Sequence, residues 1–382
     1  MIDLTRQEIA TAANVIIVKV GTRVLTNESG ALNEQRISDL AEELSELIED
    51  GRKIVLISSG AVGAGMSRLG LTERPRDLAR LQAVAAIGQT NLIETYDRTF
   101  RKHDRHAAQV LLTSEDLNHR ARYLNVRNTI LMLLECGAVP IINENDTVAV
   151  DELAITFGDN DRLAAMVTNL IRAPLMIILS DVDGVYDGDP NAEGSQVIDT
   201  ITQLDQQALP HVKDHKTGLS KGGMASKLEA ARIATLAGEN VIIASGRKPG
   251  VLRRIMQGES VGTLILAQGK SISPLKRWIG FSAKTSGSLQ LDDGAVSAIA
   301  ARGRSLLPAG ITKVEGEFKK GDVVSICDPS GKEVARGLTN YDAAEVRKIK
   351  GLKSEHITQV LGYHPYDEVI HRDNMAVTDG SA

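Results

Sequence analysis

Lys19 lies in an apolar run whose composition otherwise predicts a buried parallel strand. The run reads NVIIVKVG, 14–21, and it is rich in valine and isoleucine and closed by a glycine. A lysine is almost never fully buried without a partner, because removing an ammonium from water is costly. Lys19 therefore either belongs to an edge strand or reaches a negative group near the end of its strand.

Short acidic and amide side chains gather in two later segments. NEND, 143–146, ends another apolar run, and FGDND, 157–161, precedes the helical pattern RLAAMVTNL. Asp159, Asn160 and Asp161 suit the start of that helix, where short polar side chains cap and negative charge is favoured. Three such residues exceed the need of one cap, and acidic groups near Lys19 would compensate a buried ammonium. The alternative interpretation is that these residues only cap the helix.

Two glycine-rich turns have the placement of anion-binding loops. SSGAVGAG, 58–65, follows an apolar run and opens a helix, and TGLSKGGMASK, 217–227, is the second. The first is not a dinucleotide fingerprint, because Arg68 occupies the position of the third glycine. The second is not a Walker A loop, because Met224 follows Gly223. Together they predict a phosphate site of another construction, and tight turns without a ligand are the alternative.

Other chemistry-bearing residues are less informative. The acidic turn SDVDGVYDGDP, 180–190, lacks the spacing of a calcium loop and is interpreted as a strand-end turn on the nucleotide side. His211 and His215 have helical spacing, but no third ligand follows, so we predict no metal site. Cys136 ends an apolar helical pattern and is predicted to be a core thiol rather than a nucleophile.

Composition limits the class of protein. The 382 residues are 42% hydrophobic and 24% charged, as in an ordinary globular protein, and a net charge of −5 argues against a chain that mainly grips a polyanion. We find neither a signal-peptide pattern nor an apolar run of the ~20 residues that span a bilayer. Two distant cysteines exclude a disulfide framework. We therefore expect a cytoplasmic protein without a membrane partner.

Apolar runs alternate with helical patterns over the first 270 residues. This alternation predicts an α/β fold with a mainly parallel open sheet and helices on both faces, in which ligands bind at the carboxyl ends of the strands. The segment KSISPLKRWIG, 270–280, is interpreted as a linker, and short strand patterns with turns follow it. We expect domains over 1–272 and 276–375, the second small and β-rich. The predicted strands lie within 14–21, 53–60, 107–113, 138–146, 175–186 and 240–246.

Six motifs in this order resemble the amino acid kinase superfamily: VIIVKVGTRVLT, LISSGAVGAG, PIINENDTVAV, FGDNDRLAA, ILSDVDGVY and KGGMASKLEAA. The likeness covers nearly the whole chain, and the C-terminal part resembles a PUA domain. Within the superfamily, the chain most resembles the members that use ATP and Mg²⁺ to phosphorylate the side-chain carboxylate of L-glutamate, in the first step of proline biosynthesis. The resemblance also implies feedback inhibition by proline and a homo-oligomer, either a dimer or a tetramer.

The resemblance implies roles for three groups of residues. Lys19 and Lys227 would be the catalytic lysines that face the phosphates, and Asp161 the aspartate that holds them. The substrate group would comprise Ser59, Gly60, Asp146, Asp159 and Asn160. The ATP group would comprise Lys19, Ser180, Asp181, Lys221, Gly222, Gly223, Met224, Ala225, Ser226 and Lys227. Lys221 stands where the superfamily members often have threonine, and it either adds a phosphate contact or points to solvent.

A carboxylate acceptor is already ionised at neutral pH, so the implied reaction needs no general base. The rival acceptors within the superfamily are carbamate, acetylglutamate, uridylate and aspartate. A rival of another class is an RNA-binding protein that works through its PUA-like part. From Lys276 onward the chain has 15 Lys/Arg and 14 Asp/Glu, a net charge of +1, which does not indicate nucleic-acid binding as the main function.

Overall fold

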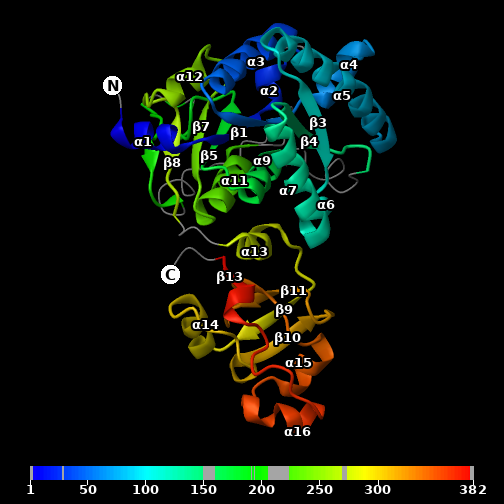
Figure 1. Ribbon diagram of the computed structural model, residues 1–382, viewed down its shortest axis with the longest axis vertical. Helices are drawn as coiled ribbons and strands as arrows, with labels where there is room; N and C mark the ends of the chain where they lie inside the picture. The colour runs from blue at the N-terminus through cyan, green and yellow to red at the C-terminus, as the bar shows by residue number, and fades with distance from the viewer. Residues whose placement is uncertain are drawn as a thin grey trace. The chain divides into compact units, whose positions relative to one another are not determined.

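The computed structural model describes residues 3–27, 30–148, 160–190, 192, 194–204, 223–268 and 273–378. By their internal contacts the residues form two compact units. The first comprises 1–116 and 124–270, and the second comprises 117–123 and 271–382. Figure 1 shows the elements of each unit in chain order.

Among the described residues, eight strands form the sheet of the first unit. They are β1 (Val15–Val20), β2 (Lys53–Ser58), β3 (Ala107–Leu112), β4 (Val139–Glu144), β5 (Leu175–Ser180), β6 (Thr200–Ile201), β7 (Asn240–Ser245) and β8 (Thr263–Ile265). Their order is β3-β4-β2-β1-β5-β7-β8-β6. The pairs from β3 to β7 are parallel, and β8 is antiparallel to β7. The predicted mainly parallel sheet is confirmed.

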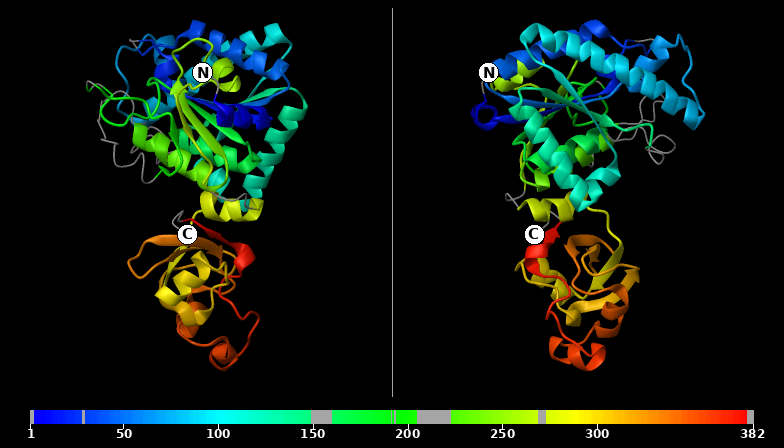
Figure 2. Two further views of the ribbon diagram at one scale, coloured as in Figure 1. Left: turned by 90° about the vertical axis from the view of Figure 1, so that its left-hand side faces the viewer. Right: turned by 45° about the vertical axis from the view of Figure 1, so that its right-hand side comes forward.

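Helices cover both faces of this sheet (Figure 1, Figure 2). The helices of the first unit are α1 (Leu4–Ala12), α2 (Thr22–Leu25), α3 (Glu34–Glu49), α4 (Ala61–Arg68), α5 (Leu78–Phe100), α6 (Ser114–Asn118), α7 (Arg120–Glu135), α9 (Asn160–Ile171), α11 (Met224–Leu236) and α12 (Val251–Met256), of which α6 and α7 extend into 117–123. On one face, α3, α5 and α12 share a buried apolar cluster with β1. On the other face, α9 packs on β1 and β5, and α11 packs on α9 and β7. No helix in the described part of the chain has the length and apolar content that a bilayer crossing requires.

β1 lies in the interior of the sheet and not at its edge. It pairs in parallel with β2 on one side and with β5 on the other, so that Lys19 is opposite Ile57 and Ile178. Ile16 and Val18 belong to the cluster under α3, and side chains alternate along a strand, so Lys19 faces α9. The edge-strand explanation of Lys19 is therefore wrong, and a negative partner must lie on the α9 side.

Close contact between α4 and α5 explains part of the first glycine-rich turn. A β-carbon at Gly65 would lie 1.9 Å from the carbonyl oxygen of Val84, and one at Gly88 would lie 1.8 Å from that of Ala61. Larger residues would force the helices apart. Gly65 therefore serves helix packing, a role that the sequence did not indicate, whereas Gly60 forms the turn itself at φ +103°.

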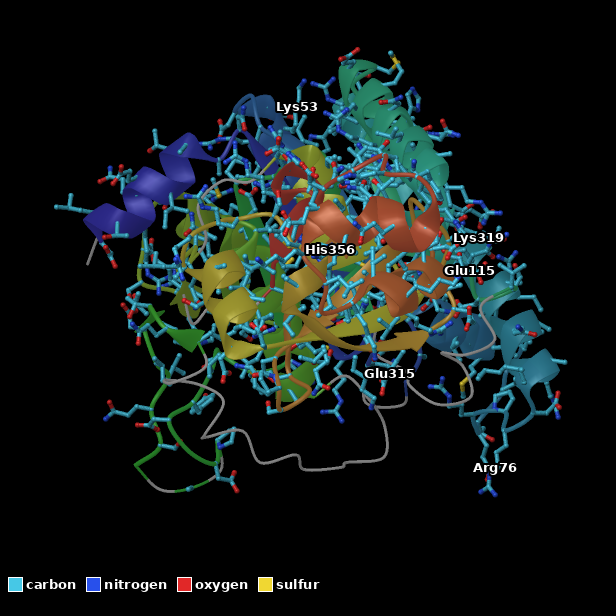
Figure 3. The ribbon with its side chains drawn as sticks, turned by 90° about the horizontal axis from the view of Figure 1, so that it is seen from below. Lys53, Arg76, Glu115, Glu315, Lys319 and His356 are labelled. Atoms are coloured by element: carbon cyan, nitrogen blue, oxygen red, sulfur yellow. The ribbon has the colours of Figure 1, made fainter. Side chains whose placement is uncertain are left out.

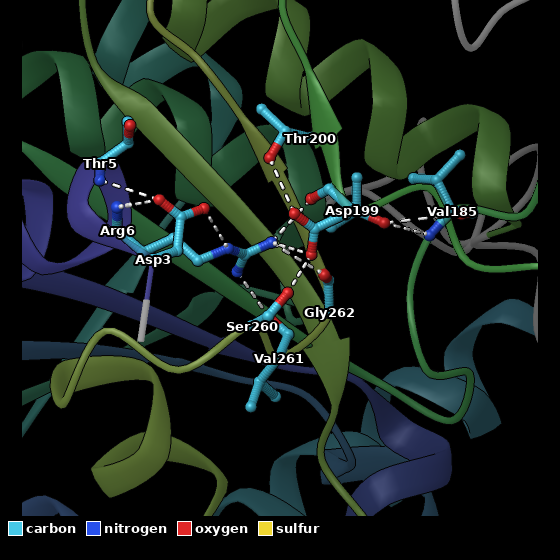
Figure 4. A network of polar contacts seen from close by, with 10 residues as sticks. Asp3, Thr5, Arg6, Val185, Asp199, Thr200, Ser260, Val261 and Gly262 are labelled. Carbon is cyan, nitrogen blue, oxygen red and sulfur yellow. Dashed lines mark hydrogen bonds and ion pairs between the residues drawn. The ribbon is translucent and has the colours of Figure 1, made fainter. Parts of the chain in front are cut away.

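Arg6 ties α1 to the β6–β8 edge of the sheet (Figure 4). Its guanidinium is buried and donates to the carbonyl oxygens of Val261 at 2.9 Å, Asp199 at 2.6 Å and Gly262 at 3.1 Å. It also forms an ion pair of 3.2 Å with the carboxylate of Asp199, which accepts from Ser260 as well. Several acceptors on one buried cation compensate its desolvation.

The second unit contains a smaller mixed sheet of order β10-β9-β11-β12-β13. Its strands are β9 (Gly287–Leu291), β10 (Ile311–Gly316), β11 (Val323–Cys327), β12 (Glu333–Leu338) and β13 (Met375–Val377), and its helices include α13 (Pro274–Arg277), α14 (Asp293–Ala300), α15 (Ala343–Ile349) and α16 (Ile357–Leu361). A separate core, with Leu289, Ile326 and Tyr341 fully buried, holds this unit together. The prediction of a small β-rich C-terminal part is confirmed.

Two sequence predictions are wrong. The expected linker contains α13 and a π-helical turn, Trp278–Ser282, and Trp278 is buried and donates from its indole nitrogen to Leu117 O at 3.2 Å. Cys136 is exposed, because it follows α7 on the solvent side and does not enter the core. His211 and His215 lie outside the described residues.

Replacement of Arg6 by leucine should destabilise the first unit. The substitution removes the donor from three carbonyl oxygens, and we expect a loss of about 3 kcal/mol in the free energy of unfolding. Calorimetric unfolding measures the change. Arg98→Leu is the matched control, because Arg98 pairs with Glu34 at the surface, where loss of an ion pair costs less than about 1 kcal/mol. Equal losses in the two variants would contradict the role given to Arg6.

Candidate active site

Asp161 lies between two lysines at the carboxyl edge of the sheet. It is the second residue of α9, and its carboxylate contacts the Lys19 ammonium at 2.5 Å and the Lys227 ammonium at 3.2 Å, each through a different oxygen. All three side chains are buried, with Asp161 only 1% exposed. Ser226 donates a further hydrogen bond of 2.8 Å to Asp161. Segments far apart in the sequence therefore build one charged triad, which we define as Lys19, Asp161 and Lys227.

The environment keeps the centre of this triad anionic. Burial alone would raise the pKa of Asp161, but the two neighbouring ammoniums and the hydrogen bonds from Lys19 and Ser226 hold the pKa below its ordinary value. Burial lowers the pKa of Lys19, an effect that Asp161 opposes and Lys227 reinforces. With both lysines protonated, the triad carries one net positive charge in a poorly solvated place. Such a site favours an anionic ligand.

A cluster of amides adjoins the triad, because Asn160 precedes Asp161 on α9. The side-chain nitrogen of Asn160 donates to the hydroxyl oxygen of Ser59 at 2.9 Å and to the side-chain oxygen of Asn143 at 3.0 Å. Asn143 donates in turn to Gln89 at 2.9 Å. Ser59 follows β2 directly, and Asn143 lies near the end of β4. The carboxyl ends of neighbouring strands thus supply one polar patch.

A second flank of the triad lies at the ends of β5 and β7 and at the start of α11. Ser180 ends β5 and donates to the carboxylate of Asp181 at 3.2 Å. Burial would raise the pKa of Asp181, but its hydrogen bond and ion pair with Arg23, at 3.0 Å, hold the pKa below its usual value. Gly223 precedes α11 in extended conformation, and no side chain caps this helix. The backbone N–H groups of Met224, Ala225 and Ser226 form its first turn, where anions are favoured.

The remaining predicted residues fall into two groups. Gly60 precedes α4. Asp146 lies just past β4 and is half-buried, and its charge interacts with that of Arg74. Asp159, Lys221 and Gly222 lie outside the described residues. Sequence reasoning assigned no role to Asn143, Gln89, Arg23 or Arg74. Asn143 had a signal, since it belongs to the NEND segment, whereas Gln89 lies within an ordinary helical pattern.

Comparison with known proteins agrees with this arrangement. The model of the "Amino acid kinase family" matches residues 14–245, and the model of the "PUA domain" matches residues 287–361. The first match spans more than half of the chain and includes every residue of the charged triad. The chain belongs to the amino acid kinase family. As a member of a kinase family, it uses ATP.

Several curated relatives of the chain have the name glutamate 5-kinase. The protein of that name from Rhodopirellula baltica is 48% identical over 97% of this chain and 96% of its own length. Those from Caldanaerobacter subterraneus subsp. tengcongensis and Thioalkalivibrio sulfidiphilus are each 46% identical, over 95% and 98% of this chain and 98% and 99% of their own lengths. The likeness therefore includes both units of the structure.

Removal of the charge of Asp161 should make the stability of the protein depend on pH. In Asp161→Asn, two buried ammoniums lose their counter-charge, which we expect to cost about 3–5 kcal/mol at pH 7. The deficit should shrink as the pH rises toward 10, because burial lowers the pKa of Lys19 and this lysine deprotonates in the folded variant before it does in the unfolded chain. It should also shrink as the pH falls below about 4, because the aspartate of the unfolded wild type then takes up a proton, while the lowered pKa keeps folded Asp161 ionised, so its stabilising effect declines.

Thermal unfolding of the wild type and the variant across this pH range measures the difference. Asp183→Asn is the control, since Asp183 pairs with Lys248 at the surface, where both side chains are more than 40% exposed. A deficit of Asp161→Asn that stayed constant from pH 7 to pH 10 would show that Asp161 does not hold Lys19 charged.

Proposed function

We propose that this chain transfers the γ-phosphoryl group of ATP to the side-chain carboxylate of L-glutamate, which gives L-glutamyl 5-phosphate and ADP. The observation that carries the proposal is the charged triad, with the buried Asp161 bound by one lysine from the sheet and one from α11. The names of the curated relatives support the choice of acceptor. The reaction would be the first step of proline biosynthesis.

The chief obstacle to this reaction is electrostatic, since a carboxylate must approach a polyanion. Two unit charges 4 Å apart repel by about 4 kcal/mol at an effective dielectric constant of 20. Lys19 and Lys227 would reduce this repulsion from the two sides of the transferring group. Asp161 would keep both ammoniums in place before the substrates arrive, so that no reorganisation is needed during transfer.

The two flanks of the triad suit the two substrates. The uncapped amino end of α11 would receive phosphate oxygens on its backbone N–H groups, with Ser180 and Asp181 beside the nucleotide. Ser59, Gly60, Asp146 and Asn160 would hold the acceptor on the other flank. Because the acceptor carboxylate is ionised at neutral pH, no side chain has to remove a proton from it.

The site suits an Mg²⁺ ion that is bound mainly by the phosphates of ATP. The described residues contain no group of three acidic, histidine or cysteine side chains that could hold a metal, and Asp161 is already engaged by two lysines. Mg²⁺ in kinases is commonly held by substrate phosphates, water and one or two carboxylates, and Asp181 is one of the described carboxylates on the nucleotide flank. When bound, Mg²⁺ would neutralise phosphate charge.

An acceptor assay tests the proposal. Hydroxylamine traps an acyl phosphate as a hydroxamate, so ATP, L-glutamate and the protein should yield glutamyl hydroxamate with release of ADP. Faster ADP release with carbamate, acetylglutamate, uridylate or aspartate would contradict the choice of glutamate. Proline inhibition and a dimeric or tetrameric state stay predictions, and the same assay with added proline tests the first.

Loss of Lys19 should slow the chemical step strongly. We expect Lys19→Ala to lower kcat on the order of 10²–10³, the loss seen when one preorganised donor is removed from a transition state. Steady-state rates at saturating ATP and L-glutamate measure it. Lys53→Ala is the control, because Lys53 opens β2 at the opposite end of the strands and projects into solvent (Figure 3). A kcat of Lys19→Ala within a few-fold of the wild type would exclude the proposed role.

A further inference from the structure

A chain of buried amides connects α5 with the start of α9. Gln89 in α5 is 7% exposed and accepts from the side-chain nitrogen of Asn143 at 2.9 Å. Asn143 is 3% exposed and accepts from the side-chain nitrogen of Asn160 at 3.0 Å. Asn160 is an expected substrate residue, but neither Gln89 nor Asn143 has a role in the reaction as described so far.

The backbone N–H of Glu144 decides how these amides are oriented. It donates to the side chain of Asn143 at 2.9 Å, and because an N–H group only donates, the atom it meets must be the oxygen of Asn143. The nitrogen of Asn143 is then directed to Gln89, which must present its oxygen. Asn160 must likewise present its nitrogen to the oxygen of Asn143. One backbone group thus sets the direction of three side chains.

This direction leaves two buried atoms unsatisfied. The side-chain oxygen of Asn160 and the side-chain nitrogen of Gln89 have no hydrogen-bond partner among the described residues. A buried polar atom without a partner costs about 1–3 kcal/mol, so an arrangement that leaves two of them requires an explanation. The nitrogen of Asn160 is engaged by Ser59 and Asn143, and its oxygen is therefore the atom left to accept from a ligand.

We propose that Gln89 and Asn143 are positioning residues that make the site selective for an acceptor with an α-ammonium group. They hold the Asn160 amide so that its free oxygen accepts a hydrogen bond from that ammonium. An ammonium has three donors and no acceptor, so it matches an oxygen, whereas a reversed amide would present N–H groups to it. The inference rests on the proposed function, because it assumes an amino acid as the acceptor.

The test compares L-glutamate with glutarate, which has the same two carboxylates and lacks the α-ammonium. Gln89→Leu removes the oxygen that orients Asn143 and keeps a similar volume. We expect kcat/KM for L-glutamate to fall about tenfold, mainly through a higher KM, the equivalent of one hydrogen bond. The kcat/KM for glutarate and the KM for ATP should stay at the wild-type values, because neither involves the α-ammonium.

Two further variants make the comparison specific. Gln89→Glu keeps an oxygen that accepts from Asn143, so it should retain the preference for L-glutamate over glutarate. Gln35→Leu is the matched surface control, because Gln35 lies in α3, is exposed and contacts Asp39. Hydroxamate formation with each acceptor measures kcat/KM, and thermal unfolding of each variant measures any loss of stability separately.

Equal losses with both acceptors in Gln89→Leu would overturn the inference, since they would reflect packing and not recognition of the ammonium. An unchanged kcat/KM for L-glutamate in that variant would overturn it as well. Both results leave the proposed function intact. A wild-type protein that forms no hydroxamate from L-glutamate would overturn the proposed function and this inference together.

Discussion

The buried contact of one aspartate with two lysines is the constraint on which the rest of this structure depends. Taking two ammoniums out of water costs several kcal/mol each, and a single carboxylate cannot neutralise both. Asp161 therefore makes the burial of Lys19 and Lys227 tolerable and still leaves one positive charge for a ligand. A site of this kind is less than ideal for stability alone, and it is well suited to hold phosphate groups while an anion attacks them.

The fold explains why these groups meet at one place. β1 carries Lys19 through the middle of a parallel sheet, where the carboxyl ends of β2, β4 and β5 also arrive. α9 begins at this edge and presents Asn160 to the amides and Asp161 to the lysines as consecutive residues. The proposed nucleotide flank and the proposed acceptor flank are therefore joined through one helical turn, so a shift of α9 would disturb both.

Much of this arrangement could be predicted from the sequence, for identifiable reasons. Long runs of β-branched residues predict buried strands, and the polar residues that follow them indicate the edge where ligands bind, so β1, Ser59 and the segment around Asp161 were expected at a common site. The order of six motifs indicated the family. The two-residue β6 and the three-residue β8 have no counterpart in the pattern, because so few residues show no periodicity.

The role of Gln89 could not be predicted, because it depends on a contact with Asn143, 54 residues away, and on the backbone N–H of Glu144. The exposure of Cys136 was missed because the sequence places it at the end of a helix but does not show which side of that end faces solvent. Residues 117–123, which belong to the second unit, were missed because contacts between distant segments leave no local signal.

We expect Asp161 to act by positioning the lysines and not by contributing charge to ATP binding. A single-turnover measurement on Asp161→Asn at pH 7, together with the Kd for ATP, separates the two effects. If Asp161 acts only by positioning the lysines, ATP should bind within a few-fold of the wild type, whereas a direct effect of its charge would tighten ATP binding, because a negative charge beside a polyanion is lost. Phosphoryl transfer to L-glutamate should fall about 10²-fold, the cost of misplacing a catalytic group by about 1 Å. A wild-type transfer rate in this variant would contradict the account.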